Sequence, residues 1–93
     1  MKVGRMALVD AEAMAKIHPA TFKVPSKEEL NRLAIGSIVK VSDGRERFWV
    51  QLTAIDEPHL VGRIDNELLG LAGHGLTLDD QIYLRRCNIY SIA

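Results

Sequence analysis

The sequence predicts an α+β fold in which two short N-terminal helices precede a small curved antiparallel β-sheet, or a partly open barrel, of about five strands. Two short segments with helix-capping residues, a change of hydrophobic period after Gly36, and an Asp43-Gly44 turn signal lead to this prediction. The 93 residues suffice for a single domain, with a helical N-terminal part, residues 1–35, and an antiparallel β part, residues 36–93.

The two predicted helices are defined by the residues that begin them. Asp10 is a good N-cap for the first helix, residues 11–18, because its carboxylate can accept a free backbone N–H of the first turn. Ser26 and Glu29 have the spacing of a capping box, which opens the second helix, residues 27–34. Both helices are short, so they need a sheet to pack against.

The remainder of the chain alternates apolar and polar residues, which is typical of strands. Asp56, Glu57 and Pro58 form the second turn. The last two segments are read as a hairpin-like pair. The predicted strands cover residues 37–41, 47–55, 59–65, 81–86 and 88–92.

The Asp43-Gly44 pair favours a two-residue type I′ turn, in which both central residues have a positive φ. This turn would set Val41 opposite Glu46 and Val39 opposite Phe48. It leaves one apolar inner face, and Gly62 suits a bend or bulge in it. The predicted core residues are Val39, Val41, Phe48, Val50, Leu52 and Ile64.

The outer face of this sheet is the best candidate for a functional site. Its single Trp and several Arg residues could anchor a protein partner or a second copy of the chain. They could also stack bases and neutralise phosphates of a single strand. Alternatively, the helices cover Trp49, and Arg63 with Asp65 is a solvated pair. The candidate interaction face comprises Lys40, Arg47, Trp49, Gln51, Arg63, Asp65, Tyr83 and Arg85.

Composition narrows the classes of function. Twelve basic and twelve acidic residues cancel, so nucleic-acid binding is less favoured than a protein partner or homodimer. No run approaches the roughly 20 apolar residues of a membrane span, and the start of the chain lacks the apolar core of a signal peptide. With a single Cys87, the chain fits a cytoplasmic protein without a membrane contact.

No motif assigns catalysis, and we expect no catalytic residue, cofactor or metal. His59, His74 and Cys87 lack the spacings that place two ligands on one metal. Asp79 and Asp80 are better read as the polar turn before a strand than as an acid–base pair. A small metal-dependent or small-molecule enzyme stays as an alternative that His59 or His74 would serve.

The order of several segments resembles an uncharacterised bacterial family of small domain-of-unknown-function proteins. The segments are HPATFKVPS, GSIVKV, GRERFWVQLTAID, LVGRIDNELL, HGLTLDDQIYL and NIYSI, which span most of residues 18–92. The family pattern has a Gly-Glu-Arg-aromatic-Trp-Val strand, a Gly-x-x-x-Asn turn and an Ile-x-x-Ile ending. This chain departs from it with GRERFW and with LDDQIYL in place of a Gly-Asp strand. The resemblance implies a small β domain and no catalytic residue.

Overall fold

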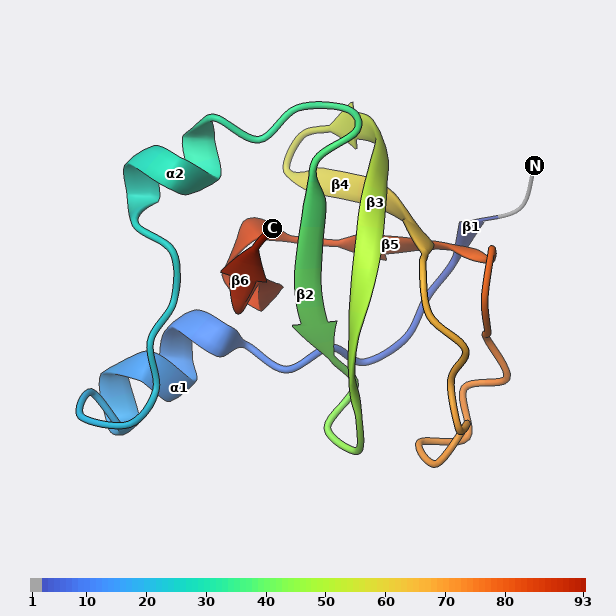
Figure 1. Ribbon diagram of the computed structural model, residues 1–93, viewed down its shortest axis with the longest axis horizontal. Helices are drawn as coiled ribbons and strands as arrows, with labels where there is room; N and C mark the ends of the chain where they lie inside the picture. The colour runs from blue at the N-terminus through green and yellow to red at the C-terminus, as the bar shows by residue number, and fades with distance from the viewer. Residues whose placement is uncertain (1–2) are drawn as a thin grey trace.

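Six strands form one mixed sheet in the order β1-β5-β4-β3-β2-β6, with two short helices beside it (Figure 1). This computed structural model describes residues 3–93, so Met1 and Lys2 of the predicted domain lie outside the described residues. The elements are β1 Val3–Gly4, α1 Ala11–Ile17, α2 Lys27–Asn31, β2 Ile38–Ser42, β3 Arg47–Asp56, β4 His59–Ile64, β5 Gln81–Leu84, the 3-10 helix η1 Arg86–Asn88, and β6 Ser91–Ile92.

The α+β class is confirmed, but the sheet differs from the prediction at both edges. Strand β1 comes before the helices and pairs parallel with β5, so the sheet has six strands and is mixed. The expected hairpin between residues 81–86 and 88–92 is wrong, because β6 pairs with β2. The chain turns away through η1, where the Asn88 side chain accepts the Arg85 N–H and donates to the Val9 carbonyl.

Capping determines where both helices start. The Asp10 carboxylate accepts the Ala13 N–H at 2.9 Å, and Ser26 and Glu29 form the predicted reciprocal capping box. Helix α2 is shorter than predicted and ends at Asn31. None of the helices in residues 3–93 is long and apolar enough to cross a membrane.

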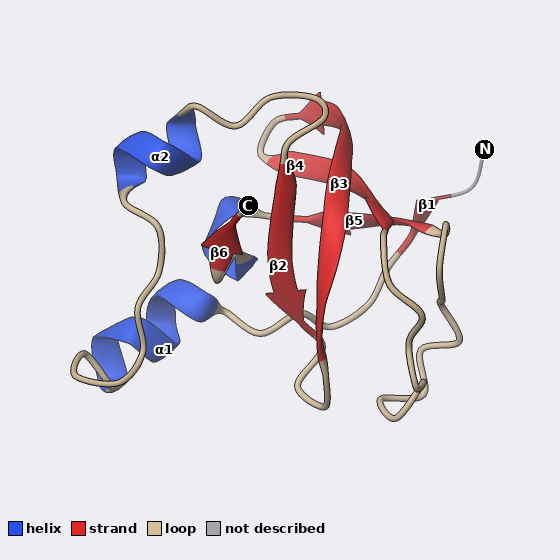
Figure 2. Ribbon diagram, viewed as in Figure 1, coloured by secondary structure: helices blue, strands red, loops and turns tan. Residues whose placement is uncertain are grey.

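The hydrophobic core lies inside the curl of the sheet. Figure 1 shows β2 and β3 running upright in front, while β5 runs crosswise behind them. Figure 2 shows both helices on the same side of β2, and Leu30 and Leu33 of the α2 region pack against the core cluster. Every predicted core residue is buried. The fully buried set includes Val39, Val41, Phe48, Val50, Leu52, Leu60, Ile64, Ile82, Leu84 and Ile89.

The β2–β3 hairpin keeps the predicted faces but not the predicted register. Val41 lies opposite Phe48, two residues further along β3 than the type I′ turn would place it. The loop contains four residues, because the Asp43 carboxylate accepts the N–H groups of Arg45 and Glu46 at 2.9 and 2.8 Å. A shift of two residues restores the same side of a strand, so the inner face is unchanged.

Strands β3 and β4 form the hairpin predicted around residues 56–58, and Val50 lies opposite Ile64 and Leu52 opposite Gly62. The bulge lies on β3, between Leu52 and Ala54, rather than at Gly62. A Cβ atom on Gly62 would overlap the Cγ1 atom of Val50, so the glycine is required by close packing across the sheet.

The long loop between β4 and β5, residues 65–80, is attached to the tip of the β2–β3 hairpin. The Asp43 carboxylate lies 2.9 Å from His74 Nε2, and both side chains are buried. His74 Nδ1 accepts the Leu76 N–H at 3.0 Å, so the ring proton lies on Nε2 and is donated to Asp43. The Glu46 carboxylate accepts the N–H groups of Leu69 and Gly70. Two carboxylates of the hairpin therefore hold the loop.

The environment of Asp43 makes this attachment sensitive to pH. Burial on its own would raise the pKa of the Asp43 carboxyl, but hydrogen bonds from Glu46, Arg45 and His74 outweigh burial and lower it below the ordinary 3.8. A carboxyl with a lowered pKa in the folded state stabilises the fold above its ordinary pKa. That contribution is lost as the pH falls through the folded-state pKa.

Replacing Gly62 by Ala should lower the free energy of unfolding by about 1 to 3 kcal/mol, because the new methyl group overlaps Val50. Urea denaturation of Gly62→Ala, Val50→Ala and the double variant measures this effect. The double variant should lose less than the sum of the single losses, since Val50→Ala removes the overlapping atom. Strictly additive losses would contradict the packing explanation.

Replacing Asp43 by Ala should lower the free energy of unfolding by about 2 to 3 kcal/mol near pH 7, because the variant leaves two backbone N–H groups and buried His74 without an acceptor. The difference from the unmodified protein should narrow as the pH is lowered below the ordinary carboxyl pKa. Urea denaturation across this pH range measures both effects. The exposed Asp56, replaced by Ala, is the control, and an equal loss in that variant would overturn the explanation.

Candidate functional site

The observed register places most of the candidate interaction face on one side of the sheet. Lys40 lies opposite Trp49 across β2 and β3, and Gln51 lies opposite Arg63 across β3 and β4. These residues alternate with buried core residues along each strand, so they share the outer face. Trp49 and Tyr83 lie on opposite sides of the Gln51–Arg63 pair. These four residues form a diagonal band across the outer face of the sheet.

Trp49 is half-buried on the outer face, and a cationic side chain lies over its ring. The Lys40 ammonium lies 4.9 Å from the centre of the indole ring. The Trp49 backbone N–H donates to the Asn66 side-chain oxygen, which gives Asn66 a structural role. Leu30 and Leu33 of the α2 region pack against the core cluster on the other face, so α2 does not cover Trp49.

Arg47 occupies one end of the band, against two aromatic rings. Its guanidinium carbon lies 4.8 Å from the centre of the Tyr90 ring and 6.0 Å from that of Phe22. The two rings contact each other at 4.8 Å. Stacking of this kind holds a guanidinium plane in place while leaving its N–H donors available.

Arg63, in the middle of the band, has partners within the chain. It donates to the Gln51 side chain at 2.9 Å and lies 3.9 Å from the carboxylate of Asp79. The predicted alternative pair with Asp65 is not found. Asp65 is exposed, and its backbone N–H donates to the Trp49 carbonyl. Arg63 is therefore less available to a partner than Lys40 or Arg47.

Tyr83 and Arg85 lie at the other end of the band. The Arg5 guanidinium carbon lies 4.6 Å from the centre of the Tyr83 ring, and His59 contacts the same ring edge-on at 5.8 Å. Arg85 follows β5 as the N-cap of η1, and with Tyr83 it lines a cavity of about 290 Å³. This end of the face is separate from the Trp49 end.

Three cations at the two ends of the band have no carboxylate in close contact. Within residues 3–93, no carboxylate lies within 4.0 Å of the cationic groups of Arg5, Lys40 or Arg47, whereas Arg63 has Asp79. Each of these three cations lies over an aromatic ring. The face thus combines apolar surface with free positive charge, a combination suited to an anionic partner.

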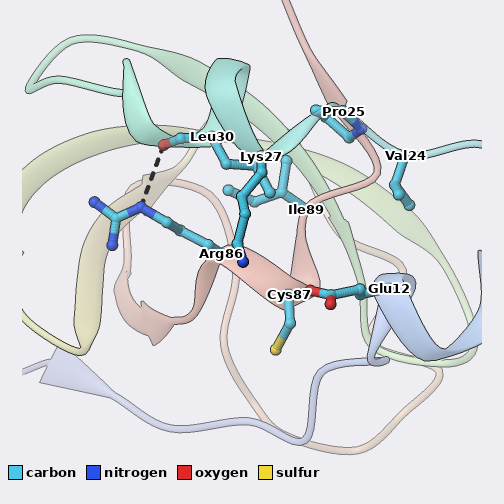
Figure 3. A pocket seen from close by; sticks show the side chains of 8 residues that line it. All are labelled: Glu12, Val24, Pro25, Lys27, Leu30, Arg86, Cys87 and Ile89. Carbon is cyan, nitrogen blue, oxygen red and sulfur yellow. Dashed lines mark hydrogen bonds between the residues drawn. The ribbon is translucent and has the colours of Figure 1, made fainter.

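A separate cavity of about 260 Å³ lies between the helices and η1 (Figure 3). Its walls include Leu30, Ile89 and Cys87, and Arg86 donates to the Leu30 carbonyl at 3.2 Å. Burial raises the pKa of the Cys87 thiol, and the carboxylates of Asp10 and Glu12 raise it further. Because the thiolate is the nucleophilic form, this thiol is poorly suited to attack a substrate.

Metal-ligating side chains do not gather in the part of the chain that the structure describes. Within residues 3–93, no group of three or more His, Cys, Asp or Glu side chains could hold a metal ion. His74 has both ring nitrogens engaged, one with Asp43 and one with Leu76. His59 packs against the Tyr83 ring. The two histidines that an enzyme would use therefore have structural partners.

Sequence reasoning missed the residues that complete both ends of the band. The predicted hairpin pairs the strand that contains Tyr90 with residues 81–86, which would separate Tyr90 from Arg47, whereas β6 pairs with β2. The alternation of apolar and polar residues in NIYSI places Tyr90 beside Arg47 only when the pairing of β6 with β2 is known. Arg5 belongs to a segment without a predicted element, and no local signal places it over Tyr83.

Comparisons with known proteins add no relative to this description. No protein-family model, curated protein or solved structure matches the chain. The resemblance of residues 18–92 to an uncharacterised bacterial family therefore stays a prediction. The outer face is the feature that bears on function, because three of its cations lie over aromatic rings with no carboxylate within 4.0 Å among residues 3–93.

Proposed function

We propose that the protein is a non-catalytic binding module that docks an acidic segment of a protein partner on its outer sheet face. The observation that carries the proposal is the pairing of Lys40 with Trp49 and of Arg47 with Tyr90, without a carboxylate within 4.0 Å of either cation in the described part of the chain. Trp, Tyr and Arg are the residues that most often dominate the binding energy of protein interfaces.

The charge of the face favours a different protein over a second copy of the chain. A symmetric dimer joins the same face of both copies, so Lys40 and Arg47 of one copy would meet a face that carries the same two cations. Like charges brought together in an interface are strongly unfavourable. An acidic segment supplies the opposite charge, and its extended backbone could follow the diagonal band from Trp49 toward Tyr83.

An acidic protein segment also fits the chain better than a nucleic acid. Twelve basic and twelve acidic residues leave a net charge of zero, so the protein as a whole has no long-range attraction to a phosphate backbone. A short acidic segment needs only the local cations of the band. Single-stranded nucleic acid remains the second candidate because Trp49 and Tyr90 could stack bases.

Binding of a Trp-free peptide rich in Asp and Glu should change the emission of Trp49, which is the single Trp of the chain. The double variant Lys40→Ala/Arg47→Ala should bind about 30-fold more weakly, which corresponds to roughly 2 kcal/mol. Added salt should weaken binding by the unmodified protein. Fluorescence titrations give the dissociation constants.

The matched control is Lys16→Ala, which removes an exposed cation from α1. Its affinity for the peptide should equal that of the unmodified protein. No emission change with the peptide, or equal weakening in the control, would refute the acidic partner. Tighter binding of an oligothymidylate strand than of the peptide would replace it by a single-stranded nucleic acid.

Replacing Trp49 by Ala should abolish peptide binding while leaving the fold intact. The backbone N–H of residue 49 keeps its bond to Asn66 in the variant, and the core face of β3 is untouched. We expect a loss of about 1 kcal/mol in the free energy of unfolding, typical of a partly exposed site. Circular dichroism melting measures stability, and anisotropy of a labelled peptide measures binding. An unfolded variant would show that Trp49 is a structural residue.

A further inference from the structure

A small cavity of about 150 Å³ lies beside Lys40 and Arg47, at the border of the outer face. It is formed by three segments far apart in the sequence, namely the connector between α1 and α2, the β2–β3 hairpin, and β6 with the residue before it. Drug-sized ligands occupy pockets of roughly 300 Å³ or more. This cavity therefore suits a single chemical group. Its polar lining comprises Thr21, Lys23, Lys40, Arg47, Tyr90 and Ser91.

The charge of this lining is of one sign. Lys23, Lys40 and Arg47 are the charged residues of the lining, and among residues 3–93 no acidic residue lines the cavity. Within residues 3–93, no carboxylate lies within 4.0 Å of their cationic groups. Three like charges around one cavity repel each other unless an anion lies between them.

The kinds of hydrogen-bond donor in the lining favour one class of anion. Arg47 is stacked on the Tyr90 ring, which holds its planar fork of N–H donors in place. Thr21 and Ser91 carry hydroxyl groups on the same cavity. Several hydroxyl and guanidinium donors around a small cavity match a tetrahedral oxyanion with many acceptor oxygens, and the cationic residues of the lining favour its negative charge.

We propose that this cavity is a binding site for a phosphoryl group. When that group is carried by a side chain of the acidic partner, the site rests on the function proposed above and selects the phosphorylated form of the partner. The same chemistry could be supplied by free phosphate. Lys40 borders both the cavity and the Trp49 ring, so a phosphorylated residue in the cavity would place neighbouring acidic residues on the outer face.

Two probes test the site in the full chain: inorganic phosphate, and the acidic peptide with and without one phosphoserine. Amide chemical shifts should change at Thr21, Lys23 and Ser91 when either phosphate-bearing probe is added. Calorimetry should show the phosphorylated peptide binding about tenfold more tightly than the unmodified one. Lys23→Ala should remove most of this difference, because Lys23 lines the cavity but lies outside the sheet face. Arg47→Lys should reduce it, since a lysine has no planar fork.

The outcomes separate this site from the proposed function. Equal affinity for both peptides, with no shifts at the cavity on adding phosphate, would overturn the phosphoryl site while leaving an acidic partner in place. Shifts with inorganic phosphate, but no binding of either peptide, would support a site for free phosphate and refute the acidic partner. Lys16→Ala is again the control, and a loss of phosphate binding in that variant would contradict the location of the site.

Discussion

The alternation of side chains along β3 is the constraint on which both the core and the candidate interaction face depend. One side of this strand carries the buried Phe48, Val50 and Leu52, and the other carries Arg47 and Trp49. If the register of this strand slipped by one residue, every side chain would move to the opposite face, so the core residues and the outer residues would change places. The packing that buries the inner residues therefore also presents Trp49 outward, with no additional interaction needed to orient it.

The core could be predicted from the sequence because its signal is local. Alternating apolar residues and turn signals identified the strands from residue 37 to residue 65, and the two-residue error in the hairpin register left every inner residue on its face. The error arose because Asp43 closes a four-residue loop with its side chain, which no apolar pattern records. Strand β1 escaped prediction because two residues carry no detectable period.

The candidate site could be predicted only in part, for a related reason. The contact between Lys40 and Trp49 follows from neighbouring strands, and the sequence placed both on one face. The aromatic support of Arg47 comes from Phe22 and Tyr90, which reach it through the connector and through the β2–β6 pairing. Contacts between segments this far apart depend on tertiary structure, so propensity and spacing alone could not reveal them.

The two edge strands also have a consequence for how the chain folds. Strand β1 pairs with β5, and β6 pairs with β2. Each edge strand is therefore added to the sheet only when residues from distant parts of the sequence meet. Contacts of such large sequence separation slow folding, whereas the hairpins of β2, β3 and β4 form locally. Until β6 arrives, β2 is an open edge that could pair with another unfinished chain. Synthesis on the ribosome would therefore expose a short-lived route to aggregation.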